Sequence, residues 1–181
     1  MNRTLSVVIR QIFTLASGAA LTYGMIPVVP VYATTLPTVS SVATQGALDD
    51  LSPEAFLSET NAIRRSAGRA PLSLNPNLMQ AAESKAADML ARGYWDHFRP
   101  DDNKAPWDFI TEAGYKYSVA GENLARGFKT AQGITAAWYN SPSHKANLLS
   151  DRYTDVGYAT IETTDAAGAT QLVTVQMFGA R

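Results

Sequence analysis

The 181-residue chain contains no cysteine and only two histidines. The absence of cysteine excludes a thiol nucleophile, a disulfide framework and a cysteine-ligated zinc site. It does not assign a compartment, because a domain of this size can bury a sufficient core without disulfides. Any imidazole chemistry is confined to His97 and His144.

The chain also lacks a marked excess of charge of either sign. Lys and Arg number 15 and Asp and Glu number 16, and no basic cluster is visible. A nucleic-acid-binding domain usually carries a clustered cationic surface. We therefore expect no nucleic-acid partner.

The N-terminal segment has the pattern of an export signal. Arg3 and Arg10 are its only charged residues, and an uncharged run follows from Ile12 to Ala33. The run ends in Val31-Tyr32-Ala33, a small-x-Ala pattern that a signal peptidase can cut. It is also about as long as a bilayer span. Residues 1–33 are predicted to be a cleaved signal peptide or an anchor over residues 12–33, and both readings make the protein secreted or extracytoplasmic.

Residues 34–51 are rich in Thr, Ser, Ala and Gly and are predicted to be a flexible linker. The folded domain is predicted over residues 52–181. Helix start signals occur at Ser52-Pro53-Glu54 and at Asn75-Pro76, and Gly68 and Gly93 are expected to end these two helices. On the first helix, the apolar side chains expected on one face are Phe56, Ile63 and Ala67.

Further along the chain, helical patterns give way to strand patterns. Helices are expected over 106–113 and 131–140, with a turn or short helix over 143–149 and a strand or ordered loop within 115–127. Tyr153–Thr163 and Leu172–Phe178 alternate and flank a turn at 165–168, which predicts an antiparallel hairpin. Helices first and paired strands last favour an α+β fold with helices packed on a sheet.

Three polar residues are candidates for a catalytic, metal-binding or ligand-binding role. His97 and His144 lie outside strongly periodic segments, and Glu122 lies between apolar neighbours. An imidazole near neutral pH can bind metal or exchange a proton, although a single histidine is more often a hydrogen-bonded surface residue. No metal-binding His-x-x-x-His spacing and no Gly-x-Ser-x-Gly motif is present. Ser143 beside His144 is a poor catalytic pair, because adjacent side chains rarely point at each other.

Taken together in chain order, these segments resemble the bacterial branch of the CAP superfamily, the cysteine-rich secretory protein or SCP-like domains. The resemblance covers about residues 53–181. The matching segments are Glu59–Arg65, Ala67-Gly68, Pro71-Leu72, Leu78–Leu90, His97 with Pro100, Gly114-Tyr115, Ala120–Gly127, Trp138–Leu149, Asp155–Tyr158 and Val175–Gly179.

The resemblance implies a three-layer α-β-α sandwich with a central antiparallel sheet. It also implies that His97, Glu122 and His144 line one shallow cleft. Many family members place a second acid there, but no Asp or Glu occurs between Glu122 and Asp151, and Ser141 lies in that neighbourhood. The remaining motif residues that the resemblance assigns to the structure of the cleft are Asn61, Gly121, Asn123, Trp138 and Asn147.

Three functions remain open at this point. The favoured one is a non-enzymatic extracellular module that binds a lipid, a peptide, a cell-wall component, or zinc or another divalent metal through the cleft or its rims. The second is a zinc-assisted hydrolase of cell-envelope or peptide substrates, with His97 and His144 as metal ligands and Glu122 activating water. The third is a structural His/Glu network with binding elsewhere on the surface. A membrane contact is expected only through the N-terminal segment, and the simplest oligomeric state is a monomer.

Overall fold

The structure of the protein is a computed structural model that describes residues 50–164 and 168–181. The predicted leader (1–33) and residues 34–49 of the predicted linker lie outside the described residues. Among those that are described, no helix is both long enough and apolar enough to cross a bilayer.

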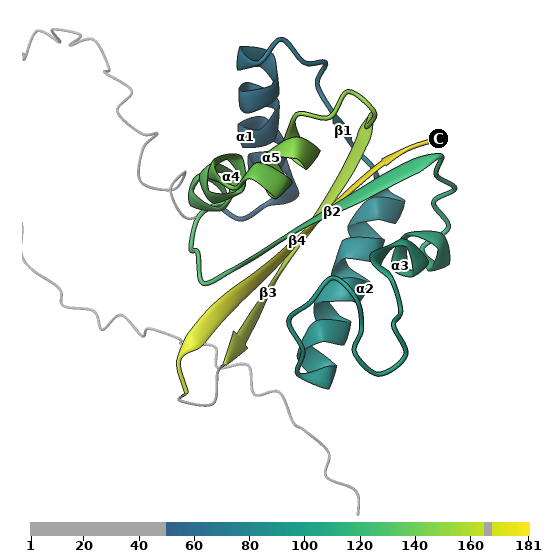
Figure 1. Cartoon of the computed structure of the whole chain (residues 1–181). Coiled ribbons are helices and arrows are strands. Elements are labelled where there is room, and N and C mark those ends of the chain that lie inside the picture. The colour runs from purple at the N-terminus through teal and green to yellow at the C-terminus, as the bar shows by residue number, and fades with distance from the viewer. Residues whose placement is uncertain (1–49, 165–167) are drawn as a thin grey trace, which may run out of the picture. The chain divides into compact units, whose positions relative to one another are not determined.

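One four-stranded sheet forms the middle of the domain (Figure 1). Its strands are β1 (Ser73–Leu74), β2 (Val119–Arg126), β3 (Asp155–Thr164) and β4 (Thr170–Ala180), in the order β1-β3-β4-β2. The pairs β3–β4 and β2–β4 are antiparallel, which confirms the predicted hairpin and the central antiparallel sheet. The short parallel strand β1 was not predicted, because two residues are too few to show a periodicity.

Helices cover both faces of the sheet, as Figure 1 shows. On one face lie α1 (Pro53–Ser66), α4 (Ala131–Asn140) and α5 (Pro142–Leu148), and on the other lie α2 (Pro76–Arg92) and α3 (Pro106–Glu112). The α+β class and the three-layer α-β-α sandwich are therefore confirmed.

The predicted helix boundaries are set by local capping. The Ser52 hydroxyl accepts a hydrogen bond from the Ala55 amide (3.2 Å), and the Asn75 side chain accepts one from the Asn77 amide (3.0 Å). Each cap is followed by a proline at the first helical position, where its missing N–H costs nothing. Gly93 ends α2 in the left-handed conformation, with φ of 68°.

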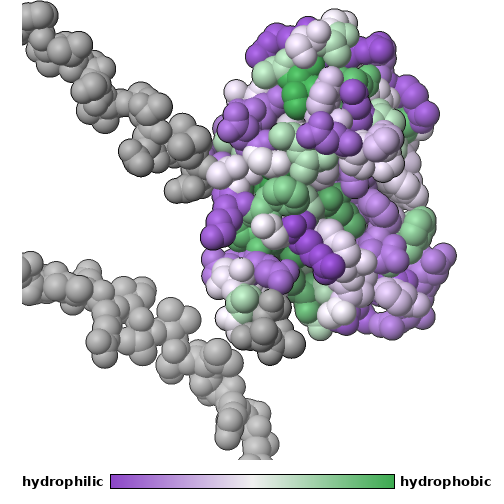
Figure 2. Space-filling view, turned by 60° about the vertical axis from the view of Figure 1, so that its left-hand side comes forward, coloured by the Kyte–Doolittle hydropathy of each residue, from purple (hydrophilic) through white to green (hydrophobic). Residues whose placement is uncertain are grey.

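Strand β4 divides the core into two halves, because successive side chains of a strand point to opposite faces. Val173, Val175 and Met177 pack with α2 and α3, whereas Phe178 packs with α1 and α4. Apolar side chains that stay at the surface form patches among hydrophilic ones on the face shown in Figure 2. The large apolar residues exposed in the described part are Phe98, Tyr117, Phe128 and Tyr139.

The buried face of α1 differs from the predicted one. Ala67 is exposed and Ile63 is only half-buried, so the predicted apolar face is wrong at these positions. Helix α1 instead buries a largely polar stripe, Phe56, Thr60, Asn61 and Arg64. Polar groups can occupy a core when they are hydrogen-bonded, and the Tyr158 hydroxyl donates to Thr60 at 3.0 Å.

A close backbone contact fixes α2 on the sheet. A Cβ atom at Gly157 would overlap the carbonyl group of Leu78 and the amide nitrogen of Met79, both in the first turn of α2. Glycine at this position of β3 therefore allows the helix backbone to rest directly on the strand.

Candidate functional site

Strand β2 forms one edge of the sheet and carries Glu122. Its alternate carbonyl groups point away from β4 and are capped by side chains from the segment 138–153. The Ala120 carbonyl accepts from the Tyr153 hydroxyl (3.2 Å), that of Glu122 from the Asn147 amide (3.0 Å), and that of Leu124 from the Trp138 indole (2.9 Å). An edge capped in this way is protected against pairing with another chain.

Glu122 is brought into direct contact with His97, which belongs to the loop between α2 and α3. The Nδ1 atom of His97 lies 2.6 Å from Oε1 of Glu122. The Glu122 side chain is only 1% exposed, whereas that of His97 is 47% exposed. The pair therefore presents its imidazole, and not its carboxylate, to solvent.

Burial and pairing shift the protonation of both groups. The hydrogen bond to Glu122 raises the pKa of His97, although partial burial opposes this. Burial raises the pKa of Glu122, and the nearby His97 and Lys85 oppose that rise. The second carboxylate oxygen of Glu122 is enclosed and has no hydrogen-bond partner within the part of the chain that the structure describes.

The loop that carries His97 is held by a buried lysine that sequence reasoning missed. The ammonium of Lys85 donates to the carbonyls of His97 (2.7 Å) and Asp96 (2.9 Å) and to the Tyr94 hydroxyl (3.2 Å). A fully buried ammonium needs such a set of acceptors. The signal in the sequence was a lysine inside the apolar stripe of α2.

A second clamp holds the same loop. Arg99 donates to both carboxylate oxygens of Asp88, at 2.7 and 3.0 Å, and to Asp102 at 2.9 Å. The Tyr94 hydroxyl also donates to Asp88, at 2.7 Å. A bidentate Arg–carboxylate pair fixes orientation as well as distance, so the backbone around His97 is positioned from two sides.

His144 lies in α5, and its Nδ1 atom is 2.8 Å from the Ser141 hydroxyl. Ser141 thus contacts this histidine in the region where many family members place a second acid. Burial lowers the pKa of His144, and the charge of His97 lowers it further. The serine that contacts His144 is Ser141 and not the adjacent Ser143.

The other motif residues join backbone segments. The Asn61 amide donates to the Leu72 carbonyl (3.0 Å) and accepts from the Leu72 amide (2.8 Å), which ties α1 to β1. Asn123 donates to Gln176 of β4 (2.9 Å) and to the backbone carbonyl of His144 (3.3 Å). Gly121 leaves the room in which the Tyr153 hydroxyl approaches β2.

A pocket of about 260 Å³ lies in front of the His97–Glu122 pair. Its wall is mostly aromatic or apolar, and its polar side chains are those of His97, Glu122 and Asn147, with the Tyr153 hydroxyl. His144 and Ser141 are not in this wall, although Asn147 from the same helix is. The lining residues are His97, Phe98, Pro106, Trp107, Ala120, Gly121, Glu122, Asn147 and Tyr153.

The donor set does not fit a three-ligand zinc site in this arrangement. Catalytic zinc takes three protein ligands and an open position. His97 and His144 supply two imidazoles. Glu122 is already in contact with Nδ1 of His97. A carboxylate in that position orients a metal-binding histidine and is not itself a metal ligand. No group of three candidate ligands occurs within residues 50–164 and 168–181.

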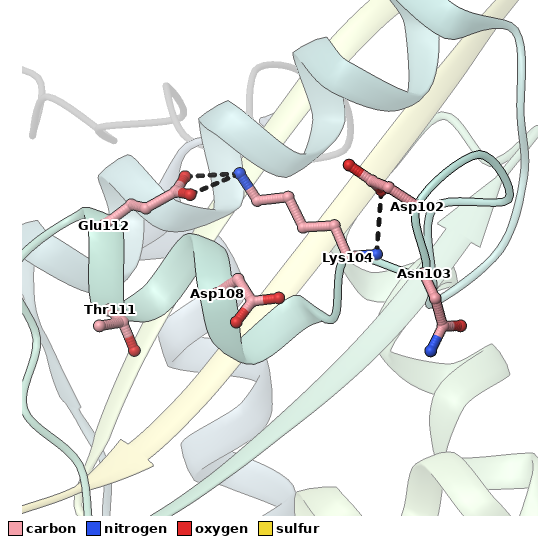
Figure 3. Close-up of a pocket in the computed structure, with 6 residues that line it drawn as sticks. All are labelled: Asp102, Asn103, Lys104, Asp108, Thr111 and Glu112. Carbon is pink, nitrogen blue, oxygen red and sulfur yellow. Dashed lines mark hydrogen bonds and ion pairs between the residues drawn. The ribbon is translucent and has the colours of Figure 1, made fainter.

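A second hollow, of about 440 Å³, lies over α3 and the preceding loop (Figure 3). Its charged groups satisfy one another. The Lys104 ammonium donates to both carboxylate oxygens of Glu112 (2.6 and 2.7 Å), and Asp102 accepts from the Lys104 amide (3.1 Å). Neither histidine lines this hollow.

Comparison with known proteins identifies the family of this architecture. The model of the cysteine-rich secretory protein (CAP) family matches residues 57–178. The chain belongs to this family. The CAP domain thus contains every predicted site residue, from Asn61 to Asn147.

The matched relatives are bacterial. The uncharacterized protein YkwD of Bacillus subtilis is 37% identical over 103 residues, 57% of this chain and 40% of YkwD. The uncharacterized membrane protein YlbC of the same organism is 28% identical over 106 residues, 59% of this chain and 30% of YlbC. This chain therefore spans less than half of the length of each relative.

Solved CAP structures show the same fold. An extracellular protein of Bacillus anthracis that contains an SCP domain superimposes with a TM-score of 0.62 at 21% identity, over 75% of this chain and 41% of that one. An outer surface protein of Borrelia burgdorferi gives 0.59 at 22% identity, over 71% of this chain and 91% of that one. At these identities the likeness shows the fold alone.

The two histidines of the CAP domain are expected to titrate on opposite sides of the ordinary imidazole pKa. Because Glu122 raises the pKa of His97, the variant Glu122→Gln should lower it, whereas the pKa of His144 should move little. The measurement is a two-dimensional NMR titration of the imidazole nitrogens, in which only two rings appear. An unchanged His97 curve in the variant would mean that the 2.6 Å contact does not form in solution.

Proposed function

We propose that this CAP domain is a binding module that takes a ligand with an oxygen acceptor and an apolar portion into the His97 pocket. The observation that supports the proposal is the make-up of the pocket wall. A half-exposed imidazole lines the pocket together with the aromatic side chains Phe98 and Trp107, while its carboxylate partner Glu122 is enclosed.

The chemistry of the imidazole selects the polar part of the ligand. When His97 is neutral with its Nδ1 proton donated to Glu122, Nε2 has no proton and cannot donate. When the ring is protonated, Nε2–H is a charge-assisted donor to a carboxylate, phosphate or carbonyl oxygen. Since Glu122 raises the pKa of His97, the donating form persists to higher pH than in an unpaired histidine.

Phe98 and Trp107 select the apolar part of the ligand. Phe98 is 43% exposed and lines the pocket together with Trp107, so the two side chains offer apolar surface there. A pocket of about 260 Å³ accommodates part of a fatty-acyl chain or one or two amino-acid side chains. Ligands of the proposed class are therefore an acylated molecule or a peptide end.

A hydrolytic role has weaker support. Ser141 contacts His144, but within the described residues no carboxylate contacts His144 to orient it as a general base. The pair also lies one helical turn apart at the start of α5, where such contacts are common local structure.

We also propose that the domain works outside the cytoplasmic membrane. The proposal is supported by the charge and apolar pattern of residues 1–33. The matched Bacillus anthracis protein is itself described as extracellular.

Binding is tested by calorimetry with two probes that share a carboxylate, dodecanoate and N-acetyl-trialanine. We expect at least one of them to bind, with an affinity that falls as pH rises through the pKa of His97. His97→Gln should weaken binding at least about tenfold, the loss of one charge-assisted hydrogen bond. His144→Gln, outside the pocket wall, is the matched control. Equal binding by wild type and His97→Gln, or binding of neither probe, would contradict the proposal.

A further inference from the structure

The outer edge of β3 has no strand partner over most of its length. β1 pairs only with Asp155 and Val156, whereas β3 continues to Thr164. No other strand of the described chain lies on this side of the sheet. The remaining eight residues span about 26 Å, at roughly 3.3 Å per residue.

The backbone groups that point outward along this edge are known from the pairing with β1. The amides of Ser73 and Asn75 donate to the carbonyls of Thr154 (3.0 Å) and Val156 (2.9 Å). The register between β3 and β4 runs without a bulge, so the alternation continues. The N–H and C=O groups of Tyr158, Thr160 and Glu162 therefore point away from the sheet, where an added strand would meet them.

A hollow of about 400 Å³ lies along the same edge. Helix α2 contributes Met79, Glu83 and Ala87, which are spaced by four residues and so share one face of the helix. The residues at the start of α1 form another part of the wall. We call this hollow the β3 groove, and its lining residues are Leu51, Pro53, Met79, Glu83, Ala87, Tyr158, Ala159, Thr160 and Ile161.

The charge of the β3 groove is negative. Glu83 is the only charged residue in its lining, and it is exposed. The rest of the lining is apolar apart from one tyrosine and one threonine, so a complementary occupant is cationic and apolar in alternation.

We propose that the β3 groove binds an extended cationic peptide segment of a partner protein, which adds to β3 as a fifth strand. The outward backbone groups of β3 would supply the main-chain hydrogen bonds, and the groove would supply side-chain selectivity. Lys or Arg side chains at the positions of the segment that point toward α2 would face Glu83. The opposite edge cannot take a strand in the same way, because side chains already cap the carbonyls of β2.

The test uses the full chain and the labelled peptide acetyl-Lys-Val-Lys-Val-Lys-Val-Lys-amide. We expect saturable binding by fluorescence anisotropy. We also expect slower hydrogen exchange at the amides of Tyr158, Thr160 and Glu162, with little change at Ala159 and Ile161, whose amides face β4. The same peptide with Glu in place of Lys should bind at least tenfold more weakly. Equal binding of the two peptides, or unchanged exchange on β3, would overturn the proposal.

Two substitutions at one position separate backbone pairing from side-chain effects. Thr160→Pro removes an outward N–H without touching the ladder to β4, a placement that edge strands accept. Thr160→Val keeps the N–H and loses the same hydroxyl contact with Thr174. We expect the proline variant to lose at least tenfold in affinity and the valine variant to bind like wild type. Equal affinities of two folded variants would overturn strand addition.

A charge variant and the free protein complete the test. Glu83→Lys should weaken binding of the Lys peptide and strengthen binding of the Glu peptide. This result does not depend on whether the proline variant folds. If the β3 amides of the free chain are already protected, the edge is occupied by another segment of the chain or by a second copy. Sedimentation would then distinguish the two, and either result would overturn the proposal.

Discussion

Replacing Gly157 by alanine is expected to destabilise the domain by about 3 kcal/mol or more, at the upper end of overpacking effects. The added methyl group would overlap backbone atoms of Leu78 and Met79. Backbone atoms cannot rotate aside as a side chain can, so α2 would have to move off the sheet. Helix α2 supplies much of one core half, including Leu78, Ala82 and Met89. The measurement is urea unfolding followed by circular dichroism.

The matched control for Gly157 is Gly68→Ala. Gly68 has a positive φ of 69° but open space around its Cβ position, so alanine there should cost only about 1 kcal/mol, from backbone strain. If Gly157→Ala lowered the free energy of unfolding no more than Gly68→Ala does, α2 would not rest on β3 as described.

Replacing Arg64 by methionine is expected to cost about 3 kcal/mol, because it removes the donor from three backbone carbonyls. Arg64 is only 1% exposed, and its guanidinium donates to three carbonyls. Those carbonyls belong to Ala70 (2.7 Å), Leu148 (2.7 Å) and Ser150 (3.0 Å). Methionine fills a similar volume but leaves these acceptors without their donor. The bond to Leu148 is buried, and a buried unpaired acceptor costs about 1–3 kcal/mol. The bonds to Ala70 and Ser150 are part-buried and contribute less.

Two further variants isolate the guanidinium of Arg64. Arg64→Lys keeps the charge but has no planar fork, so it should recover only part of the lost stability. Arg65→Met changes the exposed neighbour on the same helix and should alter stability by less than about 0.5 kcal/mol. If Arg64→Met matched Arg65→Met in urea unfolding, the three hydrogen bonds would not contribute to stability.

Local signals allowed most of the fold to be predicted. Ser52 and Asn75 cap helices as expected, because capping depends on a few adjacent residues. The hairpin of β3 and β4 follows from alternation. The polar face of α1 could not be predicted, because Thr60 and Arg64 are satisfied by groups about 85 to 115 positions further along the chain.

The candidate site was predicted only in part, for the same reason. His97 and Glu122 do meet, but that pairing was implied by family resemblance and not by their spacing. The supports of the His97 loop were missed. Lys85 lies in an apolar stripe, which is a readable signal, whereas the role of Asp88 depends on where Arg99 folds back onto α2.

The position of β4 in the sheet bears on how the chain acquires its structure during synthesis. β4 lies between β3 and β2, yet it is the last strand in the sequence. Neither β3 nor β2 can form its antiparallel pairing until residues 170–180 of β4 have been made. Until then both halves of the core also lack the side chains that β4 contributes. In a growing chain the helices can therefore form before the sheet can assemble, because the sheet needs residues 170–180.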